Sequence, residues 1–118
     1  MPSRLSPNYL RAHRKRAFLS QDEIAFLFGF KNGARISRYE RGKQTPNLPT
    51  LLGYELLFHT PARNLYGGEA NEIEHGLKER AKLLIRKLLK SGVSHLNSRK
   101  IETLRGFIDR DVPGFQAS

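Results

Sequence analysis

The side chains with the most obvious chemistry in this chain are five cations within a short segment. Lys31, Arg35, Arg38, Arg41 and Lys43 follow one another at intervals of two to four residues. A guanidinium group can donate two parallel hydrogen bonds to a phosphate or to the O6 and N7 atoms of guanine, and a lysine ammonium group binds phosphate as a point charge. Displayed along one helix, such residues form a surface for nucleic acid.

Two short helices joined by a tight turn are expected to position these cations, within residues 20–42. Ser20 followed three residues later by Glu23 is a capping box, in which each side chain accepts a hydrogen bond from the other residue's backbone N–H. Apolar residues at helical spacing follow the box, and Gly29 suits the left-handed conformation that ends many helices. The apolar residues of this first helix are Ile24, Ala25, Leu27 and Phe28.

The second helix of the pair is expected over residues 33–41, with Asn32 as its cap and Gly42 at its end. Ile36 and Tyr39 form its inward face. Its outward face carries Arg35, Ser37, Arg38 and Arg41. A short helix that is held from behind by apolar residues and displays arginines can enter the major groove of DNA. This is the working hypothesis for the chain.

The charge of the chain agrees with a polyanionic partner. Its 118 residues carry a formal net charge of +10, with a pI near 10.4, which favours nucleic acid or an anionic membrane surface. Residues 1–68 hold 11 Lys/Arg against 4 Asp/Glu, or +7, and residues 69–118 hold 10 against 7, or +3. Most of the excess positive charge therefore accompanies the two-helix segment.

Composition disfavours several other classes of protein. The chain has no cysteine, and its four histidines lack metal-ligand spacing, so we expect neither a metal nor a cofactor. No stretch approaches the roughly 20 apolar residues that span a bilayer, and no signal peptide is visible. We therefore expect a cytoplasmic protein with no membrane partner. Motifs for phosphate-binding loops, zinc sites and nucleophiles are absent, so an enzyme is not expected.

A helix is also expected before the two-helix segment, over residues 7–17, after a loose tail over residues 1–5. Ser6 would cap this helix and Pro7 would open it. Its inward residues would be Leu10 and Ala17. Its water-facing residues would be Arg11, Lys15 and Arg16, which could still contact phosphates.

Two more helices are expected after the segment. The first covers residues 48–58, and its candidate core residues are Leu48, Leu51, Leu52, Leu56 and Phe58. Thr60 would cap the last short helix, with Pro61 at its first position. Leu65 and Tyr66 would then fold back onto the core. Five short helices with brief polar turns predict an all-α bundle.

A hairpin of two helices is expected in the second half, beyond a hinge at Gly67 and Gly68. Its first helix covers residues 69–90, with one apolar stripe of Ile73, Leu77, Ala81, Leu84 and Leu88. Asn97 or Ser98 would cap the second helix, which Pro113 and Gly114 would end. Its inward residues are Ile101, Leu104 and Phe107 or Ile108. So small a hairpin must pack on the N-terminal bundle, on a second copy of itself, or on both.

A set of motif residues between positions 10 and 66 occurs in one characteristic order. It comprises Leu10, Arg14, Leu19, Ser20, Gln21, Asp22, Glu23, Ile24, Ala25, Gly29, Ile36, Ser37, Arg38, Tyr39, Glu40, Arg41, Gly42, Lys43, Pro46, Leu48, Thr50, Leu51, Leu52, Leu65 and Tyr66. With these residues the chain resembles the phage-repressor/Cro family of helix-turn-helix proteins, also called the XRE family. The resemblance covers roughly residues 8–66 and does not extend to the last 50.

The resemblance implies a five-helix repressor-like domain that binds operator DNA as a two-fold homodimer. It also implies roles for individual residues. Gln21 would contact DNA from the start of the second helix. Base edges would be met by Gly33, Ala34, Ser37 and Arg38, and phosphates by Arg41, Gly42 and Lys43. The family also pairs an arginine with a glutamate, here Arg14 with Glu40, and this partly buried ion pair would tie the first helix to the recognition helix.

Two departures from the family pattern move the expected base contacts. The chain is one residue longer than usual between Gly29 and Ile36. Moreover, Gly33 and Ala34 stand where relatives often have long polar side chains, and an alanine can at most touch a thymine methyl group. Base reading is therefore expected chiefly from Arg35, Ser37 and Arg38, with Lys31 and Asn32 as neighbouring candidates.

These observations predict a helix-turn-helix DNA-binding domain over residues 1–66 and a helical hairpin for dimerisation or docking over residues 69–118. The expected function is a sequence-specific transcriptional regulator, and more narrowly a repressor that occupies an operator. An alternative is a protein-interaction module that keeps the helix-turn-helix fold without reading DNA. The sequence does not name an operator or a small-molecule effector.

Overall fold

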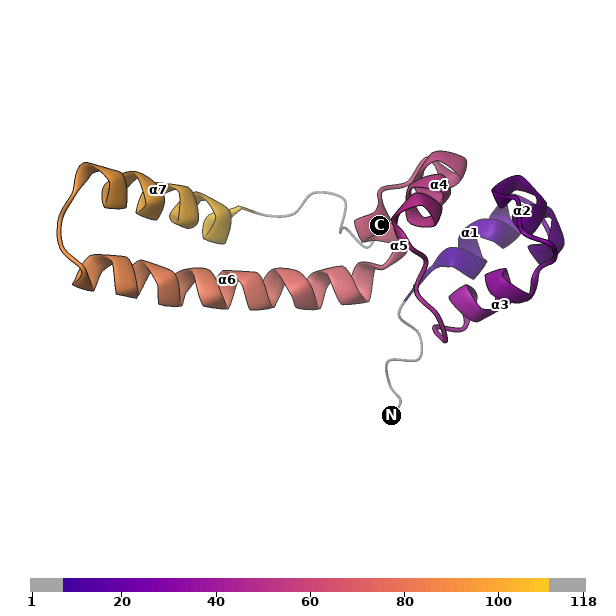
Figure 1. Cartoon of the computed structure of the whole chain (residues 1–118), viewed down its shortest axis with the longest axis horizontal. Helices are drawn as coiled ribbons and strands as arrows, with labels where there is room; N and C mark the ends of the chain where they lie inside the picture. Colours follow the sequence, from indigo (N-terminus) through magenta and orange to yellow (C-terminus); the bar gives the residue numbers. More distant parts are fainter. Residues whose placement is uncertain (1–7, 111–118) are drawn as a thin grey trace. The chain divides into compact units, whose positions relative to one another are not determined.

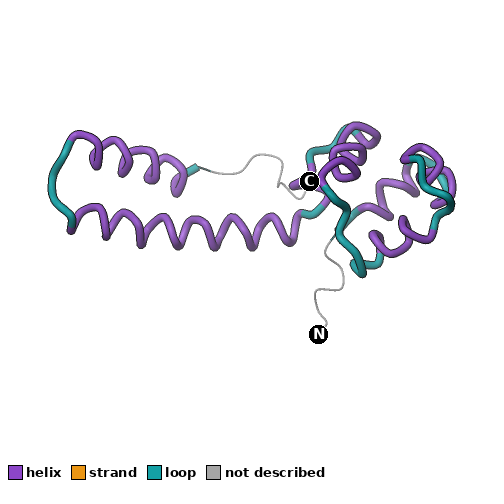
Figure 2. Tube along the Cα trace, viewed as in Figure 1, coloured by secondary structure: helices purple, strands orange, loops and turns teal. Residues whose placement is uncertain are grey.

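The structure, a computed structural model, describes residues 8–110, and all the regular elements among them are helices (Figures 1 and 2). The prediction of an all-α protein is thus confirmed. The helices are α1 (Leu10–Arg16), α2 (Gln21–Phe28), α3 (Ala34–Glu40), α4 (Leu48–Phe58), α5 (Ala62–Leu65), α6 (Gly67–Lys90) and α7 (His95–Asp109). The chain divides into two compact units, Met1–Ala70 and Asn71–Ser118.

Helix α1 begins at Leu10, three residues later than the sequence suggested. Asn8 occupies the turn before it, where its Oδ1 accepts a hydrogen bond from the Leu10 N–H at 3.0 Å and its Nδ2 donates one to the Tyr39 carbonyl at 3.0 Å. The expected cap at Ser6, the helix start at Pro7 and the tail over residues 1–5 lie outside the described residues. The expected helix end at Pro113 and Gly114 also lies outside them.

Helix α2 has the ends that the sequence predicted. The Ser20 Oγ accepts a hydrogen bond from the Glu23 N–H at 3.0 Å, and the Glu23 carboxylate accepts one from the Ser20 N–H at 2.8 Å. Gly29 follows the helix in the left-handed conformation, with φ of 79°. The capping box and the glycine stop are both confirmed, so α2 is fixed by local signals at each end.

Helix α3 is slightly shorter than expected, because Gly33 and Arg41 flank it instead of belonging to it. The Oδ1 of Asn32 accepts a hydrogen bond from the Ala34 N–H at 2.9 Å, so Asn32 supports the helix start from one residue before the cap position. Gly42, with φ of 75°, ends the segment as predicted.

The core of the first unit joins all five of its short helices. Leu10, Ile24, Ala25, Ile36, Tyr39, Tyr54 and Leu65 are buried in one cluster. All except Tyr54 were predicted to face inward. The Tyr54 ring meets Phe28 edge-on at a centroid distance of 4.9 Å, and Tyr39 at 6.3 Å. Aromatic contacts of this kind add to the area that the rings bury.

The prediction of which α4 residues face inward was largely wrong. Leu48, Leu52 and Leu56 are exposed, and the helix buries Tyr54 instead, with Leu57 and Phe58 packed beside it. Almost every position of α4 is apolar, so no clear polar face predicts the orientation of the helix. Ala17 and Leu27 were also expected to face inward, and both are exposed.

The start of α5 also differs from the prediction. Thr60 does not cap the helix; its hydroxyl donates a hydrogen bond to the Phe58 carbonyl at 2.8 Å. The Glu55 carboxylate accepts the hydrogen bond from the Ala62 N–H in its place. At the other end, the Leu65 carbonyl accepts a hydrogen bond from the Tyr9 N–H at 2.8 Å. This bond joins the end of α5 to the residue before α1.

Helix α6 begins at the expected hinge, so the two glycines are helical and do not form a loop. Helical hydrogen bonding starts at this point, because the Ala70 N–H donates to the Tyr66 carbonyl at 2.8 Å, so Gly67 and Gly68 form the first turn of the helix. In the second unit α7 runs back beside α6 (Figure 1). Its cap is Ser94, not Asn97 or Ser98, and the Ser94 Oγ accepts a hydrogen bond from the Asn97 N–H at 3.0 Å.

Candidate nucleic-acid interface

Helix α3 buries one side and exposes the other. Ile36 and Tyr39 are 0% and 2% exposed, as the sequence predicted, so the helix is fixed against the core. The predicted contact residues that lie exposed on and beside its outer side are Lys31, Asn32, Ala34, Arg35, Arg38, Arg41 and Lys43. Ser37 is half-buried. The outer side is therefore short, basic and open to a large partner.

Three neighbouring side chains hold the three arginines of this surface. The Arg35 guanidinium lies over the Phe30 ring, 4.2 Å from its centroid, in a cation–π contact. The Arg38 Nε donates a hydrogen bond to the Gln44 Oε1 at 3.0 Å, and the Arg41 Nε donates one to the Ser37 Oγ at 3.1 Å. These contacts restrict the arginines while engaging only one face or one nitrogen of each.

Gly33 does not belong to this exposed surface, contrary to the prediction. It is buried, and its N–H donates a hydrogen bond to the Asp22 Oδ1 at 2.7 Å. A Cβ atom at position 33 would lie 2.8 Å from that oxygen and 3.0 Å from the backbone carbon of Gln21. Glycine is thus required here because α2 approaches the start of α3 closely.

The ion pair expected between Arg14 and Glu40 is present. The Arg14 Nε and Nη2 donate to the two oxygens of Glu40 at 2.6 and 3.1 Å, and Nη1 donates to the Leu19 carbonyl at 3.1 Å. The two side chains are only 11% and 3% exposed. The hydrogen bond with Glu40 raises the pKa of Arg14. The pair links α1 to the end of α3 in the two-point geometry that arginine allows.

Gln21 takes part in the same network. Its Nε2 donates a hydrogen bond to the Glu40 Oε1 at 3.1 Å, and the side chain is half-buried. The resemblance to the phage-repressor/Cro family implies that Gln21 contacts DNA. In the structure its side-chain amide already donates a hydrogen bond within the protein.

A polar hollow of about 460 Å³ opens where α1, α2 and α3 meet. It is lined by Arg11, Arg14, Lys15, Ser20, Gln21, Ser37, Glu40 and Arg41. Arg14 compensates Glu40, so Arg11, Lys15 and Arg41 give the hollow an excess of positive charge. Its positive charge suits a phosphate group. The sequence predicted that each of these cations could contact phosphate, but it did not predict that they line one hollow.

Comparison of the chain with protein-family models, with curated proteins and with solved structures finds no match. Function is therefore argued from the surface of α3 and its neighbours.

Over residues 8–110, no three histidine, cysteine or acidic side chains gather to hold a metal ion. None of the helices within this range combines the length and the apolar character that spanning a membrane requires. His13 stacks on Phe58 at 5.5 Å, and burial, assisted by the Arg16 charge, lowers its pKa.

Proposed function

We propose that the chain is a sequence-specific DNA-binding transcriptional regulator, and that it represses by occupying operator DNA as a homodimer. In this proposal residues 1–66 are a five-helix repressor-like domain similar to the phage-repressor/Cro family. Helices α2 and α3 are its helix-turn-helix pair. Helix α3 lies in the major groove, and α2 crosses the DNA backbone.

The observation that carries the proposal is that α3 buries one side in the core and exposes a basic side. Arg35 and Arg38 are exposed, while Ile36 and Tyr39 anchor the opposite side in the core. Guanidinium groups held on a rigid, exposed helix can read guanine, and the +7 charge of residues 1–68 favours phosphate contacts.

The residues of this surface divide into two roles under this proposal. Arg35 and Arg38 read base edges, with Ser37 and Asn32 as shorter polar contacts and Ala34 against a thymine methyl group. The phosphate contacts are Lys31, Arg41 and Lys43, together with the hollow beside Gln21. The buried position of Gly33 removes one objection to DNA reading, because packing against Asp22 explains that glycine.

A two-fold operator requires two copies of the domain. Support for association comes from Leu48, Leu52 and Leu56, which stand exposed at four-residue intervals on α4. An isologous interface pairs a patch with itself, and these leucines carry no charge that would oppose such pairing.

The test is a selection of DNA duplexes from a random pool with the full chain, followed by binding titrations at several salt concentrations. We expect one enriched motif with two-fold symmetry, bound more tightly than unrelated duplexes, and an affinity that falls steeply with salt. Equal affinity for every duplex, or a flat salt response, would reject the proposal and favour a protein-interaction module.

A further inference from the structure

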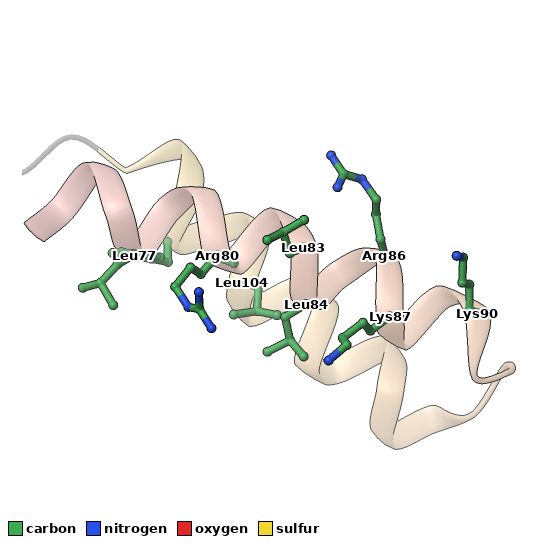
Figure 3. Close-up of a pocket in the computed structure, with 10 residues that line it drawn as sticks. Leu77, Arg80, Leu83, Leu84, Arg86, Lys87, Lys90 and Leu104 are labelled. Atoms are coloured by element: carbon green, nitrogen blue, oxygen red, sulfur yellow. The ribbon is translucent and has the colours of Figure 1, made fainter.

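A groove of about 690 Å³ lies in the second unit, between α6 and α7 (Figure 3). Leu77 and Leu84 of α6 and Leu104 and Phe107 of α7 supply much of its apolar lining. Its cationic lining includes Arg80 and Lys87, and no carboxylate of the described residues lines it. The groove is therefore both apolar and positively charged.

Two leucines of this groove stand largely uncovered within the described chain. Leu77 and Leu84 are 54% and 44% exposed, whereas Ala81, which also lines the groove, is buried. Leu77, Arg80, Leu84 and Lys87 project from one side of α6 in Figure 3. Two leucines and two cations thus alternate along a single open helix face.

The cations of the groove lack partners that neighbouring cations have. Lys78 pairs with Glu74 at 2.8 Å, and Lys82 pairs with Glu79 at 3.1 Å. Arg80 and Lys87 form no such ion pair with any described residue. The positive charge beside the exposed leucines is therefore uncompensated, and its complement is a surface that is apolar and acidic.

We propose that this groove docks an acidic amphipathic helix of a partner protein, with apolar side chains against Leu77 and Leu84 and carboxylates at Arg80 and Lys87. Helix-in-groove recognition uses this combination of apolar anchors and flanking charge. A second copy fits less well, because an isologous interface through the groove would bring its cations against their own counterparts. A flat lipid surface would leave the space between the helices unfilled.

The probe is a fluorescent peptide of about 18 residues, long enough for an isolated helix, with leucines at every third or fourth position and glutamates beside them. Its control has lysines in place of the glutamates. Binding to the full chain without DNA is followed by fluorescence anisotropy. The groove variant is Arg80→Glu with Lys87→Glu. The matched control is Arg99→Glu with Arg105→Glu, two exposed residues of α7 outside the groove.

The acidic peptide should bind the native chain, and the groove variant should bind it about tenfold more weakly or worse, because two favourable charge contacts become repulsive. The matched control should change the affinity by less than about twofold, since exposed charges outside the site contribute little. A variant with Leu77→Ser and Leu84→Ser should also bind weakly while keeping its circular dichroism spectrum.

Four results would overturn the proposal. The first is equal binding of the lysine peptide, which would show that the groove cations do not contribute to recognition. The second is an equal loss in the matched control, which would indicate general charge attraction. The third is binding of phosphatidylglycerol vesicles, and not of the peptide, that the groove variant abolishes. The fourth is a native dimer that Leu77→Ser with Leu84→Ser dissociates in sedimentation velocity, which would assign the groove to a second copy. These measurements contain no DNA, so they are independent of the proposed DNA-binding function.

Discussion

Glu40 accepts three hydrogen bonds from two residues, and Arg14 supplies two of them together with the compensating charge. Replacing Arg14 by alanine would leave a carboxylate that is 3% exposed without its cation. We predict that Arg14→Ala lowers the free energy of unfolding by about 3–5 kcal/mol. Thermal unfolding by circular dichroism measures this loss, and DNA binding should fall with it.

The control for Arg14→Ala is Arg11→Ala, since Arg11 is exposed on the same helix. Its melting temperature should match that of the native chain. If Arg14→Ala melted at the native temperature, the ion pair would contribute nothing to the fold.

Arg38 is the residue best placed to discriminate bases, because it is exposed and Gln44 holds its Nε. We predict that Arg38→Ala reduces the preference for the selected operator over single-base variants by about 1–3 kcal/mol at one position. Titrations of each variant duplex measure this preference. Gln44→Ala should cause a smaller loss in the same direction, because it only frees the Arg38 side chain. A uniform weakening on all duplexes would instead make Arg38 a phosphate contact.

At the scale of helices, the sequence predicted best where the signals are local. The Ser20–Glu23 box and Gly29 fixed α2, because capping depends on residues within one turn of each other. The sequence predicted least well which face of a helix is buried, because that depends on tertiary packing. The apolar residues of α4 suit several orientations, and the buried Tyr54 packs against Phe28 and Tyr39, which belong to other helices.

The close approach of α2 to α3 makes a prediction about glycine. Gly33→Ala should destabilise the first unit by about 1–3 kcal/mol, because its Cβ would overlap Asp22 and the Gln21 backbone. Gly76→Ala is the opposite control. It lies inside α6 with nothing within 4 Å of a Cβ, so it should stabilise its helix by about 0.5–1 kcal/mol. Thermal unfolding of both variants tests the pair, and a stable Gly33→Ala protein would contradict the close contact.

The tyrosines of the core make the first unit sensitive to alkali. Burial raises the pKa of Tyr66 to about 12, and it raises that of Tyr54 further. Because the folded pKa is above the unfolded value of about 10, the stabilisation is complete below pH ~10 and is lost as the pH rises toward the folded value.

We therefore predict that the native melting temperature falls more between pH ~8 and pH ~11 than that of Tyr66→Phe, which has no phenol to ionise. The control is Tyr9→Phe, since Tyr9 is 55% exposed. This variant should follow the native curve. Identical curves for the native chain and Tyr66→Phe would show that ionisation of Tyr66 is not coupled to unfolding.

At the scale of the whole chain, the sequence identified the surface residues of α3 but not their arrangement. Arg35 and Arg38 could be named from spacing alone, because burial of Ile36 and Tyr39 leaves the arginines of so short a helix on its outer side. The partners Phe30 and Gln44 were not named, since their contacts arise from the turns that flank α3. The polar hollow was also not predicted, because its lining comes from three helices and the sequence pattern describes each helix separately.

The net charge of +10 should make binding strongly dependent on salt. Each phosphate contact contributes about −0.9 to the slope of log K against log salt concentration. Lys43 is exposed in the loop after α3 and is proposed to neutralise one phosphate. We therefore predict that Lys43→Ala makes the slope shallower by about 0.9 and weakens all duplexes alike. Arg99→Ala, which removes one charge from the second unit, should leave the slope unchanged. If both variants shifted the slope equally, the charge of the whole chain, and not a contact beside α3, would govern DNA affinity.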